Sequence, residues 1–62
     1  MRKSYYVQTE LGREFAGTHL ECIRYASERQ NYVNVCAIHV EEDHEVYNLW
    51  YRGKLFREVK SK

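Results

Sequence analysis

Two pairs of metal-ligand residues have the spacing that comes closest to reactive chemistry in this chain. His19 precedes Cys22 by three positions, and Cys36 precedes His39 by three positions. Thiolate and imidazole ligands in two such pairs are typical of tetrahedral zinc sites. Residues three apart adjoin on a helix but project to opposite faces of a strand, so the strand-like segment around Cys36 argues against a shared metal ion. The sequence favours two free buried thiols and no metal site, with a Cys22–Cys36 disulfide as the alternative.

Catalysis and cofactor binding have weaker support. A cysteine close to one of the three histidines would combine a nucleophile with a base, but one small core leaves little volume for a substrate cleft of about 300 Å³ or more. The carboxylates of residues 41–45 crowd a polar turn, where solvation is their expected role. The glycines stand apart and form no phosphate loop. We therefore expect a protein that is not an enzyme and that binds no cofactor.

Length and composition predict one small globular domain over residues 1–62. A chain of this length buries only about 60% of its unfolded surface, which allows a single hydrophobic core. Hydrophobic residues make up 44% and charged residues 31%, a mixture typical of a folded chain. No apolar run approaches the roughly 18 residues of a membrane span, and no signal-peptide core follows Arg2 and Lys3. We expect a complete, soluble protein of the cytoplasm.

Local sequence patterns predict the helix and strands that carry the candidate histidines and cysteines. Aromatic and β-branched residues at 4–9 favour a first strand, and residues 13–16 are long enough only for an optional short second strand. Thr18 and Glu21 have the spacing of a capping box, which begins a helix that runs to about Gln30. Its apolar arc is expected to face the sheet and includes His19, Leu20, Cys22, Ile23 and Ala26.

The second half of the chain predicts a three-stranded meander. Residues 32–40 are nearly continuously apolar and read as a central strand, and residues 45–50 form the next strand after the polar turn. A three-residue loop at 51–53, with Gly53 at positive φ, then begins the last strand. The predicted fold class is α+β, with one amphipathic helix on a three- to five-stranded, mostly antiparallel sheet in the order β-(β)-α-β-β-β.

The hairpin register determines which side chains remain outside the core. A three-residue loop pairs Leu49 with Leu55 and places both on the core face. The opposite face then carries Val46, Asn48, Trp50, Lys54, Phe56 and Glu58. Because one helix covers one face of a sheet, this second aromatic face is predicted to be a contact surface.

The leading functional hypothesis is a small non-enzymatic protein-interaction module. It would bind a protein partner, or a second copy as a homodimer, and its size fits an accessory factor encoded by a virus or phage. The predicted partner-binding residues are Trp50, Phe56 and Val46 on the sheet and Tyr25 on the polar arc of the helix. No small-molecule substrate is expected.

Charge clustering supports an alternative hypothesis, a nucleic-acid-binding module. The net charge is only +1, but the last eleven residues hold five cations, which are Arg52, Lys54, Arg57, Lys60 and Lys62. Cations interleaved with aromatic rings can contact phosphates and stack bases. The same cations can instead protect an edge strand from pairing with another chain. A third hypothesis pairs the acidic turn at 41–45 with this basic tail between chains.

Overall fold

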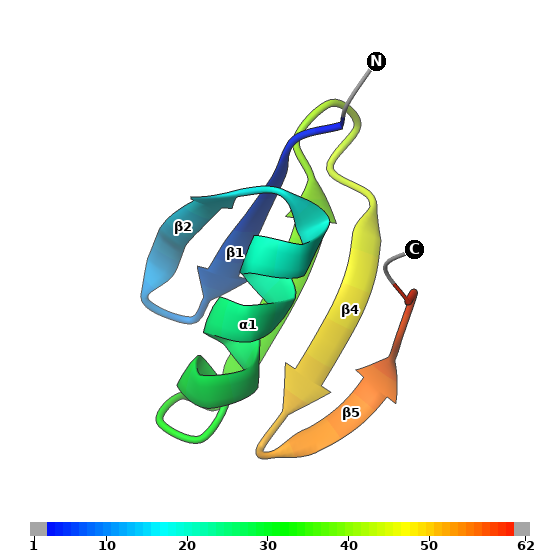
Figure 1. Cartoon of the computed structure of the whole chain (residues 1–62). Coiled ribbons are helices and arrows are strands. Elements are labelled where there is room, and N and C mark those ends of the chain that lie inside the picture. Colours follow the sequence, from blue (N-terminus) through cyan, green and yellow to red (C-terminus); the bar gives the residue numbers. More distant parts are fainter. Residues whose placement is uncertain (1–2, 61–62) are drawn as a thin grey trace.

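The fold is a five-stranded antiparallel sheet with one helix on one face, as shown by a computed structural model that describes residues 3–60 (Figure 1). The elements are β1 (Tyr5–Thr9), β2 (Gly12–Gly17), α1 (His19–Arg29), β3 (Val35–Val40), β4 (Val46–Tyr51) and β5 (Lys54–Arg57). The strand order in the sheet is β2-β1-β3-β4-β5. The predicted α+β class and element order are confirmed, and the optional second strand exists as β2.

The capping box predicted from the sequence begins α1. The Thr18 hydroxyl accepts a hydrogen bond from the Glu21 backbone N–H at 3.2 Å, and the Thr18 backbone N–H donates to the Glu21 carboxylate at 3.0 Å. Two of the N–H groups that lack a partner within the helix are thereby satisfied. Within residues 3–60, no helix combines the length and the apolar character that crossing a membrane requires.

The core lies between α1 and the central strands. Val7 on β1, Cys36 and Ile38 on β3, and Cys22 and Ala26 on α1 form one buried cluster. α1 lies over β1, β2 and β3, which leaves the α1 side of β4 and β5 largely without helical cover. Leu20, which the sequence placed on the core-facing arc, is therefore 50% exposed.

The β4–β5 hairpin differs from the sequence prediction in loop length and register. Its loop has two residues, Arg52 with φ 50° and Gly53 with φ 80°, which is the backbone of a type I′ turn. Trp50 pairs with Leu55, and Leu49 pairs with Arg57. The predicted Leu49–Leu55 pairing is wrong, because Arg52 adopts the left-handed conformation and donates its backbone N–H to the Asn34 carbonyl at 2.7 Å.

The observed register exchanges the two faces of β4. Trp50 packs against the core on the α1 side, and Asn48 is 2% exposed there. Leu49 lies on the opposite side of the sheet. A bulge in β4 further changes which residues share a face. His39 pairs with Val46 and Ile38 pairs with Asn48, so Tyr47 is an extra residue between the two pairs.

This register predicts unequal contributions of neighbouring residues to stability. Trp50→Ala removes a ring from the core and is expected to lower the free energy of unfolding by about 2–4 kcal/mol, whereas Leu49→Ala costs about 1 kcal/mol. Urea unfolding followed by far-ultraviolet circular dichroism measures both values. A larger loss for Leu49→Ala than for Trp50→Ala would instead support the three-residue loop.

Candidate functional site

The side of the sheet opposite α1 has no second layer formed by residues 3–60. The registers of β1 to β4 place ten side chains there, and we call this set the open face: Tyr6, Gln8, Arg13, Ala16, Val35, Ala37, His39, Val46, Leu49 and Tyr51. Figure 1 shows the sheet with α1 in front, so the open face lies behind it. Within residues 3–60 no helix or strand covers these side chains.

A shallow depression of about 380 Å³ lies in the middle of the open face, which is a larger volume than the sequence led us to expect. Its lining residues come from three regions of the chain and are Gln8, Thr9, Glu10, Val35, Ala37, His39, Val46 and Leu49. The aliphatic side chains among them come from β3 and β4, and the polar ones lie at the rim. A concave apolar surface with a polar rim is the composition typical of the centre of a protein interface.

A cluster of polar and aromatic side chains closes one end of the open face. Tyr6 is only 5% exposed, because the Arg13 guanidinium lies 4.4 Å from its ring centroid and the His39 ring stacks on it at 5.0 Å. The Tyr6 hydroxyl is 2.8 Å from His44 Nδ1. Arg13 in turn forms a bidentate ion pair with Glu41. The accessible part of the open face therefore extends from β3 towards β4 and β5.

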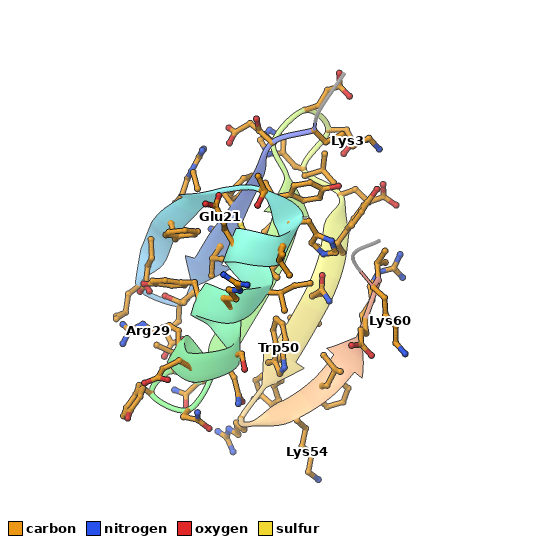
Figure 2. All side chains as sticks on the ribbon, viewed as in Figure 1. Lys3, Glu21, Arg29, Trp50, Lys54 and Lys60 are labelled. Atoms are coloured by element: carbon orange, nitrogen blue, oxygen red, sulfur yellow. The ribbon has the colours of Figure 1, made fainter. Side chains whose placement is uncertain are left out.

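The four residues predicted to bind a partner do not form one surface. Val46 lines the depression, and Phe56 is 63% exposed on β5 with its ring 6.2 Å from that of Tyr51. Trp50 lies on the α1 side of β4, where Figure 2 shows it between the helix and β5. Tyr25 stacks on Phe15 at 4.8 Å and is partly buried against the core. The register of the β4–β5 hairpin accounts for the position of Trp50, and the packing of Phe15 of β2 accounts for that of Tyr25.

Tyr25 belongs to a structural hydrogen-bond cluster that sequence reasoning missed. The Glu14 carboxylate accepts hydrogen bonds from Tyr25 at 2.9 Å, from Thr9 at 2.8 Å and from Arg29 at 2.8 and 3.2 Å. These bonds, from Arg29 most of all, lower the pKa of Glu14 to about 2. Glu14 reaches this position through a bulge in β2, which turns it towards α1. No residue pattern in the sequence marks that bulge.

The histidine and cysteine pairs are separated by the fold. His19 Nε2 is 2.8 Å from Asn48 Oδ1 and its ring stacks on Tyr5, whereas His39 lies on the open face, opposite the side chain of Cys36. Cys22 and Cys36 are free and buried in the core, and burial raises the pKa of each thiol to about 11. Across residues 3–60 the structure groups no three side chains suited to a metal ion.

The basic hairpin exposes cations that have no carboxylate partner. Among residues 3–60 the ion pairs are Arg13–Glu41 and Arg29–Glu14, so Arg52, Lys54, Arg57 and Lys60 are unpaired there. Arg52 lies 5.5 Å from the Tyr51 ring centroid, and Arg57 donates to the Val46 carbonyl at 2.8 Å. Figure 2 shows Lys54 and Lys60 pointing away from the sheet. Lys62 lies outside the described residues.

Comparison with known proteins finds no match: no family model, no curated protein and no solved structure is similar to this chain. A function is therefore inferred from the geometry of the two surfaces above. The open face offers an apolar depression, and the hairpin offers exposed rings and cations.

The low pKa of Glu14 predicts acid-sensitive stability. A carboxylate with a folded-state pKa below its unfolded value contributes stability that is complete above about pH 4.5 and is lost as the pH falls to about 2. Glu14→Gln is therefore expected to reduce stability at pH 7 and to flatten the decline between pH 4.5 and 2. Urea unfolding at several pH values measures this. Glu28→Gln, at an exposed position of α1, is the matched control, and equal pH profiles for the two variants would contradict the role of Glu14.

Proposed function

We propose that this chain is a non-enzymatic protein-binding module whose open face docks a partner protein. The observation that carries this proposal is the apolar depression of about 380 Å³ on the face that α1 leaves uncovered. Val35, Ala37, Val46 and Leu49 give it aliphatic walls, which suit an apolar side chain of the partner. The expected place of action is the cytoplasm, where free thiols are the usual state of cysteine.

The environment of the reactive groups favours binding over catalysis. Cys22 and Cys36 lie under α1 with raised pKa values, so both thiols are protonated at neutral pH. At the rim of the depression, the Glu10 carboxylate accepts hydrogen bonds from the backbone N–H groups of Asn34 at 2.9 Å and Val35 at 3.0 Å. His39 stacks on Tyr6. The polar side chains around the depression therefore support the fold and shape its rim.

A matched pair of substitutions tests this proposal. Leu49→Lys places a charge in the depression, and Leu20→Lys makes the same change at a half-exposed position on α1. Proteins cross-linked or captured by the wild-type chain should be lost with Leu49→Lys, by about tenfold or more, and retained with Leu20→Lys. Circular dichroism and urea unfolding verify that both variants fold. Equal capture by a folded Leu49→Lys variant would overturn the proposal.

A second candidate function, binding of single-stranded nucleic acid, rests on a different observation. Tyr51 is 43% and Phe56 63% exposed, and unpaired cations flank both rings. Rings of this kind stack on bases and cations neutralise phosphates, with an affinity that falls steeply as salt rises. The aliphatic depression offers no stacking platform, so this candidate depends on the hairpin alone.

Fluorescence anisotropy with a labelled single-stranded oligonucleotide separates the two candidates. If the hairpin binds nucleic acid, Arg52→Ala and Lys54→Ala each weaken binding and reduce the salt dependence, by about one released counterion each. Arg24→Ala, which removes an exposed cation from α1, should then have no effect. An absence of binding at low salt, or equal effects of all three substitutions, would exclude the hairpin as a nucleic-acid site.

A further inference from the structure

The border of the open face along β5 is positively charged. Lys54 pairs with Tyr51 and Arg57 pairs with Leu49, and paired residues of neighbouring strands project to the same side of the sheet. Both cations therefore lie beside the open face. Arg52 adjoins them, 5.5 Å from the Tyr51 ring centroid. We call these three cations the cationic margin, and within residues 3–60 none of them has a carboxylate partner.

Arg57 connects the cationic margin to the apolar depression. Its Nε–H donates to the Val46 carbonyl at 2.8 Å, and both Val46 and Leu49 line the depression. The side chain is exposed, and the bond to Val46 uses only one of its nitrogens. A guanidinium also donates through its two terminal nitrogens, which together form the parallel fork that binds a carboxylate.

The opposite side of the depression carries a negative charge. Glu10 follows β1 and lines the depression, where its carboxylate accepts hydrogen bonds from the backbone N–H groups of Asn34 at 2.9 Å and Val35 at 3.0 Å. These bonds, from Asn34 most of all, lower the pKa of Glu10, so the carboxylate is ionised at neutral pH. Because β3 and β4 separate β1 from β5, three strand spacings, roughly 14 Å, lie between the anionic side and the cationic margin.

We propose that the open face binds a partner segment in which an apolar residue lies close to an Asp or a Glu. The apolar side chain enters the depression, and the neighbouring carboxylate binds the Arg57 guanidinium. This inference rests on the proposed function, since it names the chemistry of the partner that the open face docks. Glu10 repels a carboxylate at the other side, which determines the direction in which the segment lies.

The strand pairing limits the spacing between the two groups of the partner. Leu49 and Arg57 are paired residues, whose Cβ atoms lie about 5 Å apart. An extended chain advances about 3.3 Å per residue. The carboxylate is therefore expected within about three positions of the apolar residue.

A peptide fits this arrangement of charges better than a nucleic acid does. Phosphates repeat along a nucleic-acid strand, so a strand that crosses the open face would bring phosphates towards the Glu10 carboxylate. Bases stack on aromatic rings, whereas the walls of the depression are mostly aliphatic. Nucleic acid is therefore the competing occupant of the cationic margin.

Selection from a random library of displayed peptides on the full chain tests the proposal. Peptides that the wild type retains and Leu49→Lys loses bind at the depression. Among these peptides we expect Asp or Glu within about three positions of an apolar residue. Fluorescence anisotropy with one such synthetic peptide should show binding about tenfold weaker to Arg57→Glu than to the wild type. The same peptide with Lys in place of its acidic residue should bind Arg57→Glu more tightly than it binds the wild type.

Two further variants make the outcome specific. Arg24→Glu makes the same change of charge at an exposed position of α1 and should leave peptide binding unchanged. Lys54→Glu reverses a second charge of the cationic margin without removing the contact between Arg57 and Val46, and it should weaken binding about threefold. Circular dichroism verifies that each variant folds.

The outcomes separate this inference from the proposed function. Selected peptides that bind Leu49→Lys as well as the wild type, or a selection that retains no peptide, would overturn both. Peptides that require Leu49 but show no acidic preference, with equal binding to Arg57→Glu, would overturn the partner chemistry alone.

Two other occupants of this surface would also overturn the partner chemistry. Binding of a single-stranded oligonucleotide that Arg57→Glu abolishes, together with unchanged peptide binding in that variant, would assign the cationic margin to phosphates. Self-association of the wild type in sedimentation equilibrium that both Leu49→Lys and Arg57→Glu abolish would assign the open face to a second copy of the chain.

Discussion

One eleven-residue helix supplies the second layer of this sheet, and its width sets what the rest of the structure can bury. A helix with its side chains is about 10 Å wide and neighbouring strands lie about 4.8 Å apart, so α1 covers roughly three strands. It lies over β1, β2 and β3. The core is accordingly small and built from Val7, Ile38 and two thiols, and polar contacts such as His19–Asn48 and Glu14–Arg29 fasten the helix at its margins.

The same limit bears on where the proposed functional surfaces lie. A single helix leaves the opposite face of the sheet uncovered, and a sheet wider than the helix also has an uncovered edge. In this chain the face and the edge differ in which side chains they expose. At one end of the open face, Arg13 and His39 cover Tyr6, whereas the aliphatic depression near β4 has no such cover. The edge strand β5 is short, and the cations Lys54 and Arg57 flank its apolar residues Leu55 and Phe56.

The sequence predicted the elements better than the faces. The helix start was recognisable because a capping box is local, and the strands because their composition is local. The face of the sheet on which each side chain lies could not be predicted, because bulges at Glu14 and Tyr47 shift the alternation of side chains between the two faces. The hairpin register depends on a tertiary hydrogen bond from Arg52 to Asn34, which holds a left-handed arginine that no local preference indicates. The sequence therefore predicted an uncovered face of the sheet, but Leu49 lies on that face in the structure, where Trp50 was expected.

Because α1 lies off the centre of the sheet, different strands are expected to differ in their free energy of local opening. Strands β1 and β3 are flanked by strands on both sides and lie under the helix, whereas β5 has one neighbouring strand and four exposed residues. Free energies of local opening follow burial and contact, so the amide hydrogens of β5 exchange with solvent long before those of β3. The sheet therefore has a centre that opens only with global unfolding and an edge that opens locally, and the exposed rings and cations of the hairpin lie at that edge.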